Sequence, residues 1–170
     1  MAARTLIERG YTDIGYLGGP PSATSAQDRY HGFTELVSQH PDIKARASYS
    51  KGYSFHAGRE AMMEQLQGSP AQAYFCADDV LSIGALSAIR DHGLKPAQDI
   101  GIIGLNDMEM SRWESFSLTT IRQPIKQIIT ASVDIVEEML LEPDRYPEAR
   151  IFPCRIIERE TLKAKHKQMK

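Results

Sequence analysis

Two periods of hydrophobic and polar positions alternate along this chain, one typical of helices and one typical of buried strands. Between Ser25 and His40, apolar residues recur every three or four positions, which predicts an amphipathic helix that Pro41 ends. Short runs that are apolar at most positions predict strands covered on both faces. The predicted strands are residues 13–19, 45–50, 73–77, 100–104, 118–121 and 149–159, and the predicted helices are residues 2–9, 25–40, 54–67, 78–93 and 125–141.

The order of these elements predicts the fold class. Strands and helices of these lengths alternate, which indicates βαβ units and parallel pairing of the strands. We therefore predict an α/β fold with an open, mainly parallel sheet and helices on both of its faces. The chain has 170 residues, enough for one domain with a sizeable core, and no internal repeat divides it.

Composition and charge narrow the classes of function. The net charge of -2, from 20 basic and 22 acidic residues, argues against a dedicated nucleic-acid surface, which needs clustered Lys and Arg. No apolar run is long enough to span a membrane. Cys76 and Cys154 form no CxxC motif. We expect two reduced thiols in a cytosolic protein, with a disulfide as the alternative.

Catalytic and cofactor motifs are missing from the sequence. It contains no GxGxxG, no phosphate-binding Walker loop, no HExxH and no GxSxG. The five histidines show no metal-ligand spacing. A flavodoxin-like enzyme that uses Asp78 or Asp79 would need a phosphate loop and a base, and neither is present. We expect no enzyme activity, no cofactor and no metal site.

Polar side chains gather where the predicted strands end. In an open parallel sheet, ligands bind outside the carboxyl ends of the strands. Arg29 follows the first strand, Tyr53 the second, Asp78 the third and Asn106 the fourth. The guanidinium of the arginine offers several hydrogen-bond donors, the carboxylate accepts hydrogen bonds, and the side-chain amide of the asparagine both donates and accepts them. The tyrosine ring offers a flat face. This set suits a small polar ligand such as a sugar, a nucleoside or a carboxylate.

Each of these positions also has a simpler structural explanation. Asp79 is expected to cap its helix rather than to contact a ligand. Asp107, which follows Asn106, can be a turn residue. Arg29 can pair with a surface carboxylate, and Tyr53 can serve packing alone. The convergence of several such groups on one edge of the sheet favours a ligand site.

Several stretches resemble the LacI/GalR family of transcriptional regulators, in its effector-binding domain. They are LIERGYTDIGYLGGP, SAQDRYHGF, AYFCADDVLSIGALSAIRDHGLKPAQDIGIIGLND and LTTIRQPI, and the final RIIERE resembles the closing strand of the family. The resemblance covers about residues 2–160. It implies a type I fold like that of periplasmic binding proteins, of which this chain would be the C-terminal lobe.

The resemblance implies an effector site at the same edge of the sheet. Arg29 matches the effector-binding arginine, and Tyr53 matches an aromatic residue that stacks on the ligand. Asp78 stands where many members have Asn, and Asn106 stands where many have Asp, so the exchange keeps one carboxylate and one amide across the pocket. Our hypothesis is that Asp78 faces Arg29 or a pair of sugar hydroxyls. The complete set of predicted effector-binding residues is Arg29, Tyr53, Asp78, Asn106, Ser25 and Gln123, the last two of which lie near the ligand in several members.

A domain organisation follows from the same resemblance. Residues 1–160 would be a partial effector-binding domain, in which residues 121–145 cross to an N-terminal lobe that is absent here. Residues 161–170 would be a basic, disordered tail. Operator DNA would be bound only through a missing N-terminal helix-turn-helix domain. The apolar stripe on residues 125–141 lacks its usual partner, so we expect it to pack on its own sheet or on a second chain.

The expected function is the effector-sensing and dimerisation part of a LacI-type regulator, a repressor that responds to a small polar ligand. A sugar is the first choice of ligand and a purine the second. We expect a homodimer or higher oligomer, in the cytoplasm and without membrane contact. Trp113 is expected in an interface or in packing rather than against the ligand. The alternative is a fragment of a periplasmic sugar-binding protein, which shares the two-lobe fold.

Overall fold

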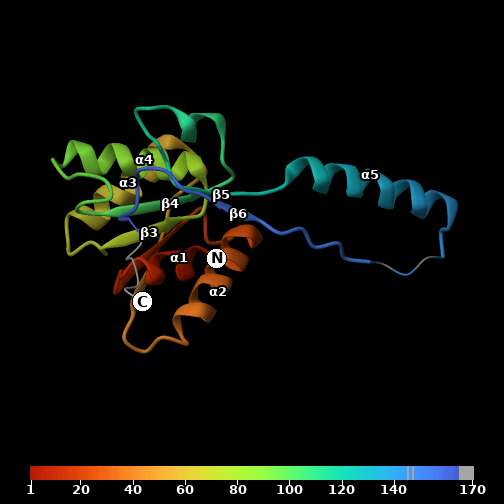
Figure 1. The fold of residues 1–170 in the computed structure, drawn as a ribbon, viewed down its shortest axis with the longest axis horizontal. Helices are drawn as coiled ribbons and strands as arrows, with labels where there is room; N and C mark the ends of the chain where they lie inside the picture. The colour runs from red at the N-terminus through yellow and green to blue at the C-terminus, as the bar shows by residue number, and fades with distance from the viewer. Residues whose placement is uncertain (145, 147, 165–170) are drawn as a thin grey trace.

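One six-stranded sheet organises the protein (Figure 1). The computed structural model describes residues 1–144, 146 and 148–164. The strands lie in the order β2-β1-β3-β4-β5-β6. Their bounds are β1 (Asp13–Gly18), β2 (Lys44–Tyr49), β3 (Ala73–Cys76), β4 (Gly101–Leu105), β5 (Thr120–Arg122) and β6 (Arg155–Ile157). The helices are α1 (Ala2–Glu8), α2 (Thr24–Val37), α3 (Phe55–Leu66), α4 (Asp79–Asp91) and α5 (Ile125–Leu141), with a short 3-10 helix η1 (Glu109–Arg112).

Five of the six strands run parallel, and only the edge strand β6 runs antiparallel, against β5. The predicted α/β fold with an open, mainly parallel sheet is confirmed. The first strand of the β5–β6 pair is shorter than the sequence predicts. It begins at Thr120; the carbonyl of Thr119 still accepts from the backbone N–H of Gly104 in β4, but its own N–H donates to the side chain of Thr161.

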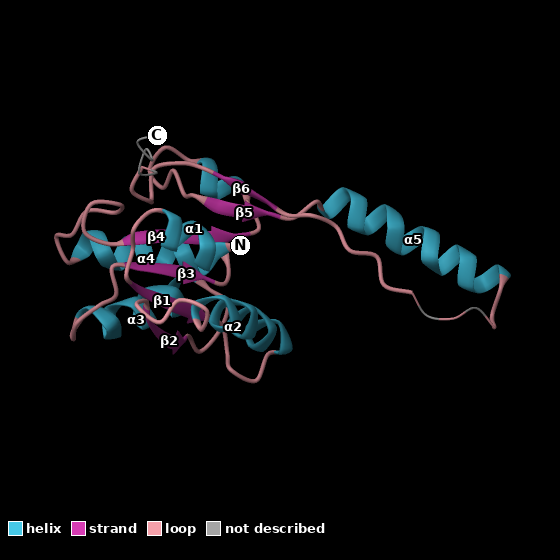
Figure 2. Ribbon diagram, turned by 60° about the horizontal axis from the view of Figure 1, so that its bottom comes forward, coloured by secondary structure: helices cyan, strands magenta, loops and turns pink. Residues whose placement is uncertain are grey.

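Helices cover both faces of the sheet, as expected (Figures 1 and 2). Side chains alternate between the two faces of each strand. On β4, Ile102 belongs to the core under α3 and α4, while its neighbour Ile103 belongs to the core with α1 and α2. The near-continuous apolar sequence of the central strands follows from this two-sided burial.

The two helices on one face, α3 and α4, pack with their backbones in contact. A Cβ atom at Gly58 would lie 2.4 Å from the carbonyl oxygen of Leu81, and one at Gly84 would lie 2.2 Å from that of Phe55. Two glycines therefore permit a separation that any larger residue would prevent. The two helices therefore form one closely packed layer on this face of the sheet.

A long arm leaves the sheet between β5 and β6. We define the arm as residues 123–154, which comprise α5 and the segment that returns from it; residues 145 and 147 lie outside the described part of the chain. Both figures show α5 pointing away from the sheet, with the returning segment alongside it (Figures 1 and 2). The prediction of a helix over residues 125–141 is confirmed. Of the two packing alternatives, its own sheet is ruled out, because Ile129, Val133 and Val136 are exposed and α5 points away from the sheet; packing on a second chain stays a prediction.

The chain returns to the body after the arm and continues further than expected. We define the body as residues 1–122 and 155–164. Thr161 and Leu162 are buried, and the hydroxyl of Thr161 donates to the carbonyl of Ile102. The predicted boundary of a disordered tail at residue 161 is therefore wrong, because these side chains replace ladder partners at the end of the sheet. The rest of the predicted tail, residues 165–170, lies outside the described residues.

Candidate functional site

Two polar residues end β4, and the backbone turns their side chains to opposite sides. Asn106 and Asp107 both have positive φ angles, 118° and 55°. Asn and Asp tolerate this region better than other residues with a Cβ atom. The side chain of Asn106 faces the rim between β3 and the arm, whereas that of Asp107 faces β5 and β6. The polar end of this buried strand therefore serves two separate sets of contacts.

Three of the predicted effector-binding residues form one chain of hydrogen bonds. The side-chain amide of Asn106 donates to Oδ2 of Asp78 at 2.8 Å, and its Oδ1 accepts from Nε2 of Gln123 at 2.6 Å. Asp78 follows β3, Asn106 follows β4 and Gln123 follows β5. Because these strands are parallel neighbours, their carboxyl ends bring the three side chains together along one edge, as predicted for an open sheet.

Asp78 is half-buried and caps α4. Its Oδ1 accepts from the backbone N–H of Val80 at 2.8 Å. Burial raises the pKa of its carboxyl above the ordinary value, although the cap bond, the charge of Arg29 and the Asn106 bond act in the opposite direction. Arg29 is hydrogen-bonded to the backbone of Ala77, the residue before Asp78. The hypothesis that Asp78 faces Arg29 or a pair of sugar hydroxyls stays a prediction.

The remaining predicted site residues lie on the same rim, in two smaller contacts. Arg29 donates from Nη1 to the carbonyl of Ala77 at 2.9 Å, which fixes it beside the end of β3. The hydroxyls of Ser25 and Tyr53 lie 3.3 Å apart. The Tyr53 ring rests on Gly19, where a Cβ atom would lie 2.2 Å from the ring. One ring face is therefore held by the protein, while the residue remains 40% exposed.

The structure corrects the expected role of Asp79. Asp78 caps the helix, so the expectation that Asp79 does so is wrong. Asp79 is fully buried and accepts from the hydroxyl of Thr120 at 2.6 Å and from the backbone N–H of Met108 at 2.8 Å. Burial raises the pKa of its carboxyl. The side chain therefore ties α4 to the segments that follow β4 and β5.

Sequence reasoning missed the importance of Asp107. Its side chain is 1% exposed and forms ion pairs with three arginines, Arg112, Arg122 and Arg159. Burial alone would raise the pKa of this carboxyl, but the hydrogen bonds and charges of Arg159 and Arg122 outweigh burial and lower it. The expectation of a simple turn residue is therefore incomplete. A possible signal was the position of an acid at a strand end opposite two arginine-bearing strands.

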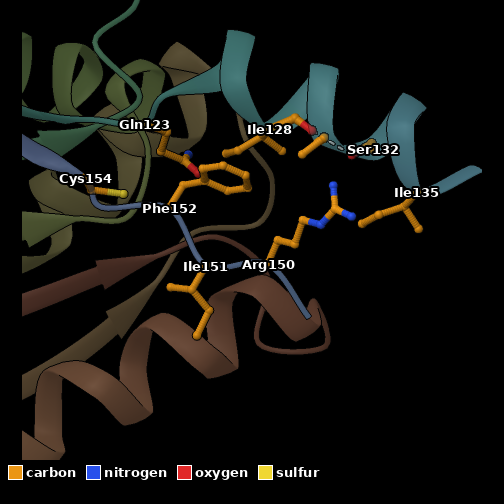
Figure 3. A pocket seen from close by; sticks show the side chains of 9 residues that line it. Gln123, Ile128, Ser132, Ile135, Arg150, Ile151, Phe152 and Cys154 are labelled. Carbon is orange, nitrogen blue, oxygen red and sulfur yellow. Dashed lines mark hydrogen bonds between the residues drawn. The ribbon is translucent and has the colours of Figure 1, made fainter. Parts of the chain in front are cut away.

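A groove lies within the arm itself. Its volume is about 350 Å³, and it separates α5 from the returning segment. Figure 3 shows Ile128, Ser132 and Ile135 on α5 facing Arg150 and Phe152, whereas Ile151 points away. Gln123 lies at the end of the groove nearest the sheet, so the hydrogen-bonded chain from Asp78 ends where the arm begins.

Trp113 lies after η1, away from the predicted site residues that follow β3 and β4. It is half exposed, and its ring stacks on that of Phe116 at 6.4 Å between centroids. The guanidinium of Arg90 lies over the other aromatic ring, 5.8 Å from its centroid. This geometry shows packing between α4 and the loop, and the expectation of an interface at Trp113 stays a prediction.

Residues 1–144, 146 and 148–164 contain neither a candidate metal site nor a candidate membrane span. No three His, Cys, Asp or Glu side chains in these residues are grouped so that they could hold a metal ion. No helix among them combines the length and the apolar character needed to cross a membrane. What the rim offers is a set of hydrogen-bond donors and acceptors with an aromatic face, which can bind a polar molecule.

Comparison with known proteins decides the family. The model of the periplasmic binding protein-like domain matches residues 3–162, nearly the whole chain. The chain belongs to this family. Several relatives and structural neighbours that it matches are LacI-type repressors, which supports a LacI-type effector-binding domain within this family. The resemblance stated from the sequence is thus confirmed, and so is the periplasmic-binding-protein-like fold.

The curated relatives of this periplasmic-binding-protein-like domain carry the names of repressors, not of enzymes. The HTH-type transcriptional repressor PurR of Aliivibrio salmonicida is 33% identical over 157 residues, which cover 89% of this chain and 46% of that protein. The probable HTH-type transcriptional repressor ExuR of Bacillus subtilis is 28% identical over 164 residues, 95% of this chain and 49% of that protein. The chain spans about half the length of the curated relatives it matches.

Solved structures of LacI-type proteins superpose closely on this domain. A Lac repressor dimer bound to operator and the anti-inducer ONPF has a TM-score of 0.88 at 28% identity; the match covers 96% of this chain and 57% of that one. A LacI-family transcriptional regulatory protein from Corynebacterium glutamicum has a TM-score of 0.83 at 25% identity, covering 95% and 63%. The arm belongs to the matched region, because so little of the chain is left out.

Proposed function

We propose that this chain is the effector-sensing part of a LacI-type transcriptional repressor, with a small polar ligand bound at the rim of the sheet. The observation that carries the proposal is the chain of hydrogen bonds from Asp78 through Asn106 to Gln123. It leads from the carboxyl ends of the central strands to the first residue of the arm. A ligand that replaced or extended these bonds would act on both parts of the molecule.

The chemistry of the rim favours a sugar first and a purine second. A carboxylate at Asp78 and a fixed guanidinium at Arg29 suit neighbouring hydroxyls, which both donate and accept. The exposed face of Tyr53 suits the apolar face of a sugar ring or a flat base. Ser25 lies beside the same ring. A buried site discriminates strongly between such ligands, because any unpaired polar group costs free energy.

The proposed partners of the whole protein follow from its relatives. One Lac repressor structure is of a dimer bound to operator and an anti-inducer. By analogy, we infer a homodimer or higher oligomer that contacts operator DNA through a separate N-terminal domain, in the cytoplasm. Effector binding would shift the population between two states by its different affinity for each of them. Trp113 would lie in or near the contact between subunits.

A periplasmic sugar-binding protein is the second candidate, because it shares the two-lobe fold. The names of the relatives favour the repressor. The two functions also predict different behaviour in one assay. A repressor that contains this chain retards operator DNA in a gel, and its effector alters that retardation, whereas a transport protein binds its sugar without any effect on DNA.

The first test is thermal unfolding of the full-length protein that contains this chain, in the presence of sugars and purine bases. A specific ligand at one hundred times its dissociation constant stabilises the folded state by about 2.7 kcal/mol. We expect a member of the panel to raise the melting temperature, and Arg29→Ala to abolish the rise. Arg59→Ala is the matched control, because Arg59 is an ion-paired arginine distant from the rim. Equal shifts in both variants would contradict binding at this rim.

The exchange of Asp78 and Asn106 gives a second, sharper test. Asp78→Asn keeps the shape of the side chain and removes its charge, so the hypothesis predicts a loss of effector affinity. Asp91→Asn is the control for charge, because Asp91 lies at the distant end of α4. If Asp78→Asn left the affinity unchanged while Asn106→Ala abolished it, the proposed role of the carboxylate would be wrong.

A further inference from the structure

A second groove, separate from the arm's own, opens where the arm meets the sheet. Its volume is about 640 Å³, which is within the range of small-molecule sites. The basic side chains that line it are Arg112, Arg122, Lys126 and Arg155, and the only acid among its lining residues in the described part of the chain is Asp107. The groove is therefore strongly positive, in contrast to the chain's net charge of -2.

The single acid in the groove has no capacity left for further cations. Oδ1 of Asp107 accepts from Arg159 at 2.6 Å and from the hydroxyl of Ser111 at 3.2 Å. Oδ2 accepts from Arg122 and, at 3.3 Å, from Arg112. A carboxylate offers about four acceptor positions, and all of them are in use. The carboxylate thus neutralises one of the surrounding charges and leaves the others uncompensated.

Two of the basic side chains have no partner within the described residues. Neither Arg155 nor Lys126 makes a hydrogen bond or an ion pair there, and both are exposed. Arg112 contributes only one of its five N–H groups to Asp107, and its side chain is 57% exposed. The groove therefore presents several free donors that converge from η1, β5, β6 and α5.

The register of the sheet adds an independent reason for an anion. In the antiparallel pair of β5 and β6, Arg122 lies directly opposite Arg155. Like charges at such a position destabilise the pair, because their Cβ atoms are only about 5 Å apart. Asp107 already holds the Nε and Nη2 side of Arg122, and an anion bound between the two arginines would remove the remaining repulsion and take up the forked donors of Arg155. The first turn of α5, whose N-cap Pro124 provides no side-chain bond, borders the same space.

We propose that this groove binds a small multivalent anion of the phosphate class, such as the phosphate group of a metabolite. A concave site of limited volume, with Arg122 held in place by Asp107, fits a compact ligand better than an extended polymer. The bound anion would link η1, the β5–β6 pair and α5 at the origin of the arm. The groove shares Asn106 and Gln123 with the effector rim, but the basic side chains that would hold the anion are not among the predicted effector-binding residues.

The test is isothermal titration of the 170-residue chain with pyrophosphate at constant ionic strength. The decisive variant is Lys126→Gln/Arg155→Gln, which leaves the Asp107 ion pairs intact. We expect saturable binding at one site per chain, with an association constant at least about tenfold lower in the variant, a change of 1.4 kcal/mol. Lys44→Gln/Lys95→Gln is the matched control, because it removes two exposed positive charges elsewhere. Equal binding by both double variants would overturn the proposal.

Further probes identify the class of anion and the independence of the site. Citrate tests whether carboxylates bind as well as phosphates, and we expect weaker binding. Arg29→Ala should leave pyrophosphate binding unchanged, so a failure of the effector proposal would not affect this result. No saturable heat with millimolar pyrophosphate would refute the anion site. The small-ligand proposal would also be wrong if a short DNA duplex bound in a manner that depended on Lys126 and Arg155 while pyrophosphate did not.

Discussion

The body and the arm use the same kinds of residue with opposite results. In the body, Leu86 and Ile102 are fully buried between sheet and helices. In the arm, Leu140 is 77% exposed and Ile151 is 93% exposed. Both regions have regular elements with apolar stripes, but only the body supplies a second layer to cover them. An amphipathic pattern therefore determines the element that forms, whereas its burial depends on a partner.

The ion pairs of the two regions differ in the same way. Asp107 in the body is enclosed by arginines, and its side chain is 1% exposed. In the arm, Arg150 pairs with Glu138 and Glu148 at the surface. Surface pairs contribute little to stability, because water and salt screen them. The body therefore contains one ion-pair cluster shielded from solvent, around Asp107, beside surface pairs such as Arg59–Asp91, whereas the pairs of Arg150 in the arm lie at the surface.

The largest expected loss of stability follows replacement of Asp107, the buried acid of the body. Asp107→Ala leaves Arg159 and Arg122 without their counter-charge, and we expect a loss of about 3–5 kcal/mol in the free energy of unfolding. Chemical denaturation at pH 7 measures it. The control Asp91→Ala, at an exposed ion pair, should cost less than about 1 kcal/mol. Similar losses in the two variants would show that enclosure of the ion pair is unimportant.

The same acid predicts a pH dependence of stability. The pKa of Asp107 is lowered in the folded state, so its carboxylate stabilises the fold at pH values above its ordinary pKa of 3.8. This contribution is lost as the pH falls from there through the lowered pKa. The difference between the parent protein and Asp107→Ala should therefore be constant from pH 7 to about 5 and shrink below 3.8. A difference that grew in acid would contradict this sign.

A matched pair of leucines measures the contrast of burial directly. Leu86→Ala in α4 removes a fully buried side chain and should cost about 2–5 kcal/mol, because it forms a cavity. Leu140→Ala in α5 should change the free energy of unfolding by no more than about 0.5 kcal/mol. Both are measured by denaturation of the 170-residue chain. A large cost at Leu140 would mean that a partner covers the arm in solution.

Substitutions on the outer face of α5 should have the smallest effect on the free energy of unfolding. They should nevertheless weaken the association of the chain with itself. Ile129, Val133 and Val136 form an exposed apolar strip there. We expect the 170-residue chain to self-associate through this strip in sedimentation velocity, and Val133→Glu to weaken the association. Thr130→Glu adds the same charge beside the strip and serves as the control. A monomeric parent chain, or identical behaviour of the two variants, would contradict the expectation.

Local signals in the sequence predicted the elements of both the body and the arm. The 3.6-residue period and Pro124 predicted α5 with its observed bounds, and the alternation of strands and helices predicted the parallel sheet. The gathering of Arg29, Asp78 and Asn106 at one edge follows from topology alone, since parallel strands place their carboxyl ends together. The exchange of Asp78 and Asn106 was visible from the resemblance, and the structure adds that the two side chains bond to each other.

What the sequence did not predict depends on contacts between distant residues. Adjacent aspartates have the same capping propensity, so only the packed structure distinguishes Asp78, the cap, from the buried Asp79. The ion pair of Asp107 with Arg159 joins residues 52 positions apart, and no local pattern marks it. Thr161 is polar and precedes a basic segment, yet it completes the hydrogen bonds of two backbone groups near the sheet's edge.

The attachment of the arm determines how a force would pass between the two regions. Its two connections leave the sheet at Arg122 and Arg155, which are directly paired on adjacent antiparallel strands. A force applied along the arm would therefore act on β5 and β6 at the same end. It would break the hydrogen-bonded residue pairs of this ladder one after another. A force that sheared β5 along β6 would have to break all three residue pairs at once, which requires a larger force. The first pair of this ladder, Arg122–Arg155, would therefore bear the load before the other two.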